Sequence, residues 1–439
     1  MTVTRFAPSP TGFLHIGNLR TALHNWMFAK KAGGRFLLRI DDTDGARSEE
    51  RFVDAIRRDL AWLGLVPDGE ERQSARFDRY EAVFAEMVAS GRIYPAYETP
   101  EELDLRRKIL AGRGLPPVYD RAALKLTDDD RARLEGEGRR PHWRFRLEAE
   151  PIEWDDMVRG PQKFDGALLS DPVVRRADGS WLYLLPSVID DADMGVTHVV
   201  RGEDHVSNTA TQMQMFAAMG AVPPAFAHEA LLVGNEGKLS KRLGSLGVEH
   251  FRASGIEPEA VVALLARLGT SDPVEAVVDT APLIAAFDFG RFGRAPARFD
   301  EAELAQVNAR IVHQLPFDRV AQALPDGMDA AAWNAVRGNL ERVADAADWW
   351  RVVTGHVDAV PVTAEDRAFL DRAAAVAAGL DWADPWAELT AALKTETGRK
   401  GKALFLPLRR ALTGMDHGPD MAALLPLIGR ERAIARLTG

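Results

Sequence analysis

The sequence predicts an α/β fold that is interrupted by an insertion and followed by an all-α C-terminal third. Residues 1–75 read as strand, glycine-containing turn, helix and strand, which is the beginning of a βαβ unit. The α/β pattern returns over residues 183–219, beyond a segment of different character. From residue 311 to the end, alanine, leucine and arginine dominate, and the apolar residues keep helical spacing.

The βαβ unit rests on clear helix and strand signals. After the first turn, apolar residues recur at helical spacing, namely Leu19, Leu23, Trp26 and Met27. Gly33 and Gly34 end that helix, and residues 36–40 form a short apolar run typical of a buried parallel strand. Asp41 follows at the carboxyl end of this strand, where open α/β sheets place ligand sites.

The later elements are less regular. Residues 76–175 are interpreted as an insertion, because prolines, glycines and a charged stretch break the α/β pattern. Residues 196–200 then predict a strand and residues 208–219 a helix. A further helix is expected over residues 259–268, before a loop rich in proline and aspartate.

Length and composition exclude several classes of protein. A chain of 439 residues favours two to four domains, and 46% hydrophobic with 27% charged residues is typical of a folded protein. No apolar run reaches about 18 residues, so no membrane span is expected. The absence of cysteine excludes disulfides and thiolate zinc sites and favours the cytoplasm. The net charge of −10 argues only weakly against a nucleic-acid partner, because local basic patches decide such binding.

The first candidate motif covers residues 8–18, a Pro/Gly turn that leads into a helix. The N-terminus of a helix has unpaired N–H groups and partial positive charge, so it attracts phosphate. Gly12 and Gly17 allow close approach of a nucleotide, and His15 can stabilise charge that develops on a phosphate oxygen. An ordinary βα turn with a surface histidine is the alternative for this segment alone.

The second candidate motif is Lys238-Leu239-Ser240-Lys241-Arg242, flanked by glycines that can act as hinges. Ammonium groups on such a loop can follow pyrophosphate as it leaves ATP. For these five residues alone, a basic surface loop is the simpler interpretation. The two motifs together, in this order, favour a nucleotide site.

Together the motifs resemble those of class I aminoacyl-tRNA synthetases, and the sequence around them is similar to that of glutamyl-tRNA synthetases. The likeness covers nearly the whole chain. It is strongest over residues 5–44 and 171–247, good from residue 395 to the end and weak between 270 and 390. Asn18 stands where many class members have a second histidine, and Asp41 where this family often has glutamate. Leu184 follows Tyr183 where a polar residue is commoner, as in a second, paralogous form from some bacteria, which favours a specialised tRNA preference.

The resemblance implies a domain plan. Residues 1–75 and 176–242 would form the two halves of a Rossmann-type catalytic domain. Residues 76–175 would be an inserted α+β domain for the acceptor stem of tRNA. Residues 243–310 would be a stem-contact region, and residues 311–439 an all-α anticodon-binding domain.

The resemblance also implies which reaction the chain catalyses and which residues form its substrate sites. The enzyme would ligate L-glutamate to the 3′ end of tRNA through glutamyl-adenylate, releasing AMP and pyrophosphate. His15 and Lys241 would be catalytic. The ATP site would comprise Pro8, Thr11, Gly12, His15, Gly17, Asn18, Lys238, Ser240, Lys241 and Arg242. Cationic and hydroxyl groups suit the two carboxylates of glutamate and an acidic group its ammonium, so its site would comprise Arg5, Ala7, Ser9, Asp41, Tyr183, Ser187 and Arg201.

Cofactors and partners follow in the same way. ATP would act with Mg²⁺, and no zinc is expected, because Ala96 and Glu98 lie where some relatives have zinc-binding cysteines. A monomer in the cytoplasm is expected, with tRNA for glutamate, for glutamine or for both as acceptor. Candidate contacts to tRNA are Arg47, Arg399, Lys400 and Lys402.

The sequence leaves three alternative functions open. A glutaminyl-tRNA synthetase shares the ancestry, but Arg5 and a helical C-terminal third argue against it. A nucleotidylyltransferase of the same fold needs neither the insertion nor the helical third. A catalytically dead, RNA-binding paralogue conflicts with the presence of His15, Lys241, Arg5 and Arg201.

Overall fold

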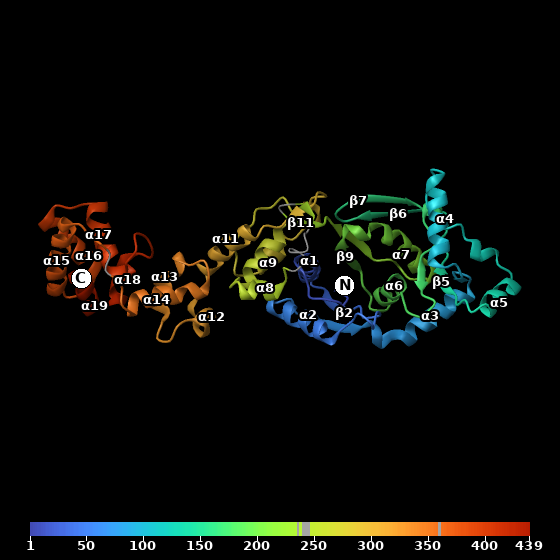
Figure 1. The fold of residues 1–439 in the computed structure, drawn as a ribbon, viewed down its shortest axis with the longest axis horizontal. Helices are drawn as coiled ribbons and strands as arrows, with labels where there is room; N and C mark the ends of the chain where they lie inside the picture. Colours follow the sequence, from blue (N-terminus) through green and yellow to red (C-terminus); the bar gives the residue numbers. More distant parts are fainter. Residues whose placement is uncertain (235–236, 239–245, 359–360) are drawn as a thin grey trace. The chain divides into compact units, whose positions relative to one another are not determined.

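The protein is described by a computed structural model over residues 1–234, 237–238, 246–358 and 361–439 (Figure 1). The chain divides into two compact units. The first comprises Met1–His250, Val262–Val274 and Asp279–Asp300, and the second comprises Phe251–Val261, Glu275–Val278 and Glu301–Gly439. Among the described residues, no helix is both long and apolar enough to cross a bilayer.

The first unit begins with the predicted βαβ element. Strand β1 (Val3–Phe6) pairs in parallel with β2 (Arg35–Ile40), and helix α1 (Ile16–Lys31) connects them. Helix α2 (Glu50–Trp62) leads to β3 (Gly69–Arg72), which is parallel to β2. All four residues of β1 are buried, as are the last five of β2. These strands are therefore covered on both faces, as the short apolar run over residues 36–40 predicts for β2.

A second α/β segment completes this layer. It contains α6 (Leu184–Asp193), β9 (His198–Gly202), α7 (Val206–Ala218) and β10 (Ala225–Glu229), with β9 and β10 parallel. The amide of Thr197 donates to the carbonyl of Val3 at 2.9 Å, so β9 begins beside β1. One apolar core joins the two halves through Val3, Leu37, Val196, Val199 and Phe226. The predicted strand and helix of this region are confirmed, with ends shifted by one or two residues.

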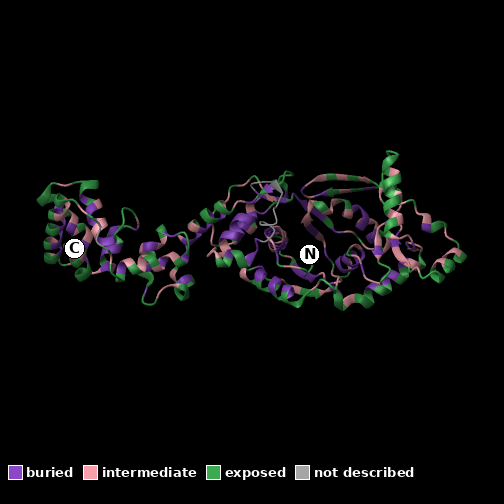
Figure 2. Cartoon of the chain, viewed as in Figure 1, coloured by how far each residue is buried: buried purple, intermediate pink, exposed green. Residues whose placement is uncertain are grey.

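Residues 77–175 contain helices and antiparallel strands. The elements are α3 (Phe77–Ala89), β4 (Ile93–Ala96), α4 (Pro100–Gly112), α5 (Asp128–Gly136), β5 (His142–Phe145), β6 (Pro151–Asp156), β7 (Gly160–Asp165) and β8 (Val173–Arg175). Strands β4, β5 and β8 form one antiparallel sheet, and β6 and β7 form a hairpin. Neither α4 nor α5 has a buried residue (Figure 2).

The packing of this segment is continuous with the second α/β segment. One cluster of buried side chains includes Tyr80, Ile93 and Phe145 together with Leu185 of α6 and Phe216 of α7. The segment therefore shares this core with the elements that follow it, and it has a second, smaller core of its own around Tyr94, Ala96 and Ala123.

The first unit also contains β11 (Leu232–Gly234), β12 (Gly237–Lys238), β13 (Ala297–Arg298) and α10 (Ala281–Ala286). Strand β11 pairs with β12 and β13. Helices α8 (Val248–Ala253) and α9 (Pro258–Arg267) contribute residues to both units. The helix expected over residues 259–268 is thus present as α9.

Beyond α9, the second unit is helical throughout its described residues. Its helices are α11 (Glu301–Val312), α12 (Phe317–Val320), α13 (Ala330–Val336), α14 (Ala346–Thr354), α15 (Ala364–Gly379), α16 (Pro385–Thr397), α17 (Lys402–Thr413), α18 (Met421–Ile428) and α19 (Arg430–Thr438). Helix α15 packs on α16, α17 and α19. The predicted all-α C-terminal third is confirmed.

Candidate active site

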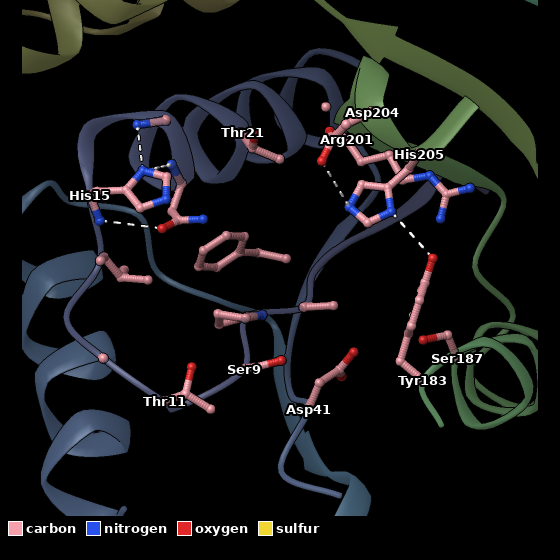
Figure 3. A pocket seen from close by; sticks show the side chains of 18 of the residues that line it. Ser9, Thr11, His15, Thr21, Asp41, Tyr183, Ser187, Arg201, Asp204 and His205 are labelled. Atoms are coloured by element: carbon pink, nitrogen blue, oxygen red, sulfur yellow. Dashed lines mark hydrogen bonds and ion pairs between the residues drawn. The ribbon is translucent and has the colours of Figure 1, made fainter. Parts of the chain in front are cut away.

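A cavity of about 1100 Å³ opens at the carboxyl ends of β1, β2 and β9, beside the N-terminus of α1. Its lining includes every residue predicted to bind glutamate and every residue predicted to bind ATP outside residues 238–242. Figure 3 shows His15 on one side of the cavity, Tyr183 and Arg201 on the other, and Asp41 in between. The topology thus brings together residues that are up to about two hundred positions apart, at the sheet edge where such ligand sites occur.

His15 is the N-cap of α1. Its Nδ1 accepts hydrogen bonds from the amides of Gly17 at 3.2 Å and Asn18 at 3.4 Å. The Asn18 Oδ1 accepts in return from the amide of His15 at 3.3 Å, which completes a capping box. In the neutral ring the proton is then on Nε2, which is free to donate to an anion. Burial lowers the pKa of His15, which favours this neutral form.

The capping geometry also explains Gly17. A Cβ at this position would lie 3.1 Å from the imidazole of His15, closer than ordinary packing allows. Asn18, which the sequence marks as a replacement for a phosphate donor, holds the backbone of His15 through its amide oxygen. Its contribution to an ATP site is therefore at least partly through His15.

The lysine motif lies mostly outside the described residues. The backbone of Lys238 belongs to β12, whereas Ser240, Lys241 and Arg242 are not described. Their assignment to ATP binding and catalysis stays a prediction.

Arg5 and Asp41 are held in place by two residues that the sequence does not mark as functional. Arg39 donates to Asp41 Oδ1 from Nε at 2.7 Å and to Asp191 Oδ1 from Nη1 at 2.7 Å. Arg5 Nε donates to the same Asp191 oxygen at 3.0 Å. Burial opposes ionisation of Asp191, but the charges of Arg5 and Arg39 outweigh it and lower its pKa. Burial raises the pKa of Asp41, and the charge of Arg39 only partly offsets this effect.

Arg201 is only partly buried and differs from Arg5 and Arg39, two buried arginines of the cavity, in its partners. Its Nη2 donates to Thr209 Oγ1 at 2.5 Å and its Nε to His228 Nε2 at 3.3 Å. Among the residues that the structure describes, no carboxylate forms a salt bridge with it. Burial and the nearby charge of Arg5 lower the pKa of Arg201 to about 10, so it remains a cation at neutral pH. The charges of Asp191 and Asp204 offset this fall only in part, and a largely desolvated cation that forms no salt bridge favours an anionic ligand.

Two hydroxyl groups complete this side of the cavity. Tyr183 Oη lies 3.4 Å from Nδ1 of His205, and Ser187 Oγ accepts from Nη2 of Arg39 at 3.4 Å. His205 lies beside Asp204, a pair that could suggest a metal ligand or a general base. Its ring instead lies edge-on to Tyr183, with the centroids 6.0 Å apart, and supports its hydroxyl.

Glu98, which lies where some relatives have a zinc-binding cysteine, belongs to a cluster of aromatic and charged side chains. Tyr119 Oη donates to Glu98 Oε1 at 2.7 Å, and the guanidinium of Arg144 lies 4.0 Å from the Tyr119 ring centroid. Over the described part of the chain, no group of three or more histidine, cysteine, aspartate or glutamate side chains could hold a metal ion. The expectation of a protein without zinc stays a prediction.

The predicted contacts to tRNA differ in how free their charges are. Arg399 pairs with Glu365 and Asp366, at 2.8 and 2.6 Å, and lies over the ring of Phe369. Its charge is thus already compensated, whereas Lys400 and Lys402 beside it are exposed. Arg47 is also exposed and pairs with Asp44, which lines the cavity with it.

Comparison with known proteins identifies the family of the chain. A family profile described as "tRNA synthetases class I (E and Q), catalytic domain" matches residues 1–306. A second profile, described as "Anticodon binding domain", matches residues 320–439. The two profiles together cover the catalytic and the all-α parts of the predicted fold.

Relatives of the same length are closely similar. The chain is 69% identical to "Glutamate--tRNA ligase 1" of Novosphingobium aromaticivorans and 68% identical to "Glutamate--tRNA ligase 1" of Rhizorhabdus wittichii, in each case over 100% of this chain and 99% of the relative. A crystal structure of a glutamate tRNA ligase from Elizabethkingia meningosepticum, in complex with its amino acid, is similar with a TM-score of 0.86 and 28% identity, covering 99% of this chain and 98% of that one.

These findings confirm the predicted fold class and the predicted enzyme, a glutamate–tRNA ligase, and do not favour the glutaminyl alternative. Because the catalytic profile covers more than half of the chain and the relatives cover all of it, the chain belongs to the class I tRNA synthetases of the glutamate and glutamine group.

Proposed function

We propose that the chain joins L-glutamate to the 3′ end of tRNA in two steps within this cavity. In the first, an oxygen of the α-carboxylate attacks the α-phosphorus of ATP, and the bond to the β-phosphate breaks. Glutamyl-adenylate and pyrophosphate are formed. In the second, the 2′-hydroxyl of the terminal ribose attacks the acyl carbon, and AMP leaves. Orientation of the reactants and stabilisation of charge supply most of the acceleration.

The observation that carries the amino-acid side of the proposal is the distribution of charge around Arg201. Glutamate has two carboxylates and one ammonium group. Arg201 offers a cation without a counter-ion, Arg5 a second one shared with Asp191, and Asp41 a carboxylate held by Arg39. Ser9 lines the cavity near Asp41 (Figure 3) and supplies a further acceptor for the ammonium. A dicarboxylic amino acid matches this set better than an amide does.

On the nucleotide side, we assign the phosphates of ATP to the N-terminus of α1. The Nε2 of His15 and the partial positive charge of the helix would stabilise the α-phosphate as it is attacked. Lys241 would stabilise the departing pyrophosphate. Mg²⁺ fits as an ion carried by the phosphates, since Asp41 and Asp44 are each engaged by an arginine. Its role would be to neutralise phosphate charge.

The remaining parts of the proposal concern tRNA and assembly. Residues 76–175 would bind the acceptor stem, residues 243–310 the stem region and residues 311–439 the anticodon. The match of residues 320–439 to an anticodon-binding profile supports the last of these. We propose a cytoplasmic monomer that uses tRNA for glutamate, for glutamine or for both. We expect it to prefer one of these tRNAs, and the rates at which it charges each purified tRNA measure that preference.

We expect glutamate to be preferred to glutamine by at least tens-fold in kcat/KM. Glutamine lacks one negative charge, so either Arg201 or Arg5 loses a charge-assisted hydrogen bond worth about 1.5–3 kcal/mol. Pyrophosphate exchange measured with each amino acid, in the presence of total tRNA, gives the ratio. Equal activation of both amino acids would move the enzyme to the glutaminyl class.

The test of the proposed function is pyrophosphate exchange with and without tRNA. With glutamate, ATP and Mg²⁺ alone, we expect exchange to be nearly silent, and to rise strongly when tRNA is added. The physical argument is that tRNA binding along the chain brings the lysine loop and the cavity into register. Strong exchange without tRNA would refute this coupling, and no exchange under either condition would refute the proposed function.

A further inference from the structure

A buried chain of hydrogen bonds leads from the β6–β7 hairpin to Arg201. His228, on β10, has a fully buried side chain. Its Nδ1 lies 2.5 Å from Oδ2 of Asp156, the last residue of β6, which is also buried. Its Nε2 lies 2.9 Å from Thr209 Oγ1 and 3.3 Å from Nε of Arg201. Three elements that are distant in sequence thus converge behind the cavity.

The partners of Asp156 determine which nitrogen of His228 carries the proton. The Oδ1 of Asp156 accepts from the amides of Val158, Arg159 and His228, at 3.0 to 3.1 Å. Burial opposes its ionisation, but these donors and His228 outweigh that effect and lower its pKa. Because an ionised carboxylate only accepts, Nδ1 of His228 must be the donor to it.

The hydrogen bonds of Arg201 likewise determine the protonation of the other ring nitrogen of His228. An arginine can only donate, so Nε of Arg201 must donate to Nε2 of His228. That nitrogen must therefore be unprotonated, and His228 is the neutral Nδ1–H tautomer. Thr209 Oγ1 accepts from Nη2 of Arg201 in the same way. One edge of the guanidinium is thus held by two neutral acceptors.

This anchoring leaves the rest of the guanidinium for a ligand. Within the described part of the chain, Nη1 of Arg201 donates to no residue, and Arg201 lines the cavity. A neutral anchor is significant, because it fixes the orientation of the cation without neutralising its charge. A carboxylate at this position would orient Arg201 equally well, but it would compete with an anionic substrate.

We propose that His228, with Thr209 and Asp156 behind it, is a positioning residue that orients Arg201 toward a carboxylate of the substrate. The proposal rests on the proposed function, in which Arg201 binds glutamate. His228 and Thr209 reduce the conformational freedom that Arg201 loses on binding, so their loss weakens binding of the amino acid and leaves binding of ATP unchanged.

Thr209→Val tests the proposal without leaving a buried charge unpaired. We expect the KM for glutamate in tRNA-dependent exchange to rise about tenfold, in line with loss of a hydrogen bond to a charged group. The KM for ATP stays within about twofold. Thr209→Ser, which keeps the hydroxyl, restores the KM for glutamate. Thr211→Val is the matched control, because Thr211 is a buried threonine of the same helix without a contact to Arg201 among the described hydrogen bonds.

His228→Gln adds a readout that a merely structural role would not change. Glutamine can present one donor and one acceptor but cannot be protonated. The charged and titratable groups that face His228 are Asp156, Arg159, Arg201 and His205. Protonation of His228 at low pH places an N–H against the guanidinium of Arg201, so in the wild type the KM for glutamate rises as pH falls. In His228→Gln this acid rise becomes smaller, and the part that remains comes from Asp41, whose pKa burial also raises.

The outcomes separate this proposal from the proposed function. A normal KM for glutamate in Thr209→Val, or an unchanged acid rise in His228→Gln, overturns the positioning role, provided that Arg201→Ala impairs use of glutamate. If Arg201→Ala also leaves glutamate kinetics unchanged, the assignment of Arg201 itself is wrong. Equal effects of Thr209→Val and Thr211→Val would likewise contradict the proposal.

Discussion

Arg201→Ala is expected to lower kcat/KM for glutamate about 100-fold or more, while the KM for ATP changes by less than about threefold. The guanidinium forms no salt bridge with a carboxylate among the described residues and lines the cavity, so we expect its partner to be the substrate. Arg201→Lys should recover part of the loss, because the ammonium keeps the charge but not the fork of donors. Steady-state pyrophosphate exchange with tRNA measures both parameters.

The same substitution is expected to leave the melting temperature unchanged or slightly raised. Removing Arg201 leaves Thr209 and His228 2.9 Å apart, where they can bond to each other, and strands no carboxylate in the described part of the chain. A partly buried cation that forms no salt bridge costs desolvation free energy, which the alanine variant does not incur. Loss of activity together with a large fall in melting temperature would show that Arg201 is structural instead.

Unlike Arg201→Ala, Arg39→Met is expected to lower stability, by about 3–5 kcal/mol in the free energy of unfolding of the first unit. The side chain of Arg39 is 1% exposed and lies within salt-bridge distance of Asp41, Asp190 and Asp191. Without the Arg39 cation, these three carboxylates lie close together with their negative charges uncompensated by it. A stability loss of this size should lower the melting temperature by at least about 6 °C in calorimetry.

The matched control is Arg57→Met. Arg57 also pairs with several carboxylates, including Glu50, Asp54 and Glu70, but its side chain is 41% exposed. Solvent screens such pairs, so the control should cost no more than about 1 kcal/mol. If both variants melt at the same temperature, the buried network does not stabilise the fold.

Local signals made the first 75 residues and the C-terminal third predictable. The helix after the Pro/Gly turn and the strand before Asp41 each have a pattern of apolar residues that only one element satisfies, and both are present as α1 and β2. The helical spacing beyond residue 311 is equally explicit. The motif residues then converge because parallel strands place their carboxyl ends at one edge.

The residues that hold the site residues in place could not be predicted from local sequence patterns. Arg39 and Asp191 are 152 positions apart and meet only when α6 packs beside β2. His228 and Asp156 are 72 positions apart and belong to different sheets. Contacts of this kind depend on tertiary packing, which no local pattern specifies. A charged residue within an apolar strand, as Arg39 is, is the one hint that the sequence offers.

The capping role of His15 is hidden in the sequence for a different reason. Serine, threonine, aspartate and asparagine are the usual N-cap residues, so a histidine followed three positions later by asparagine does not register as a capping box. The structure shows that the same ring both caps α1 and faces the cavity. The phosphate role predicted for His15 therefore depends on Nε2 alone.

The most direct test of the central claim is to identify the aminoacyl group that the enzyme attaches to tRNA. The purified chain is incubated with ATP, Mg²⁺, total tRNA and an equimolar mixture of glutamate and glutamine, and the tRNA is digested to release its terminal aminoacyl-adenosine. Mass spectrometry should detect glutamyl-adenosine that is formed only with ATP and is strongly reduced in Arg201→Ala. Glutaminyl-adenosine as the main product, or no aminoacyl-adenosine at all, would contradict the account.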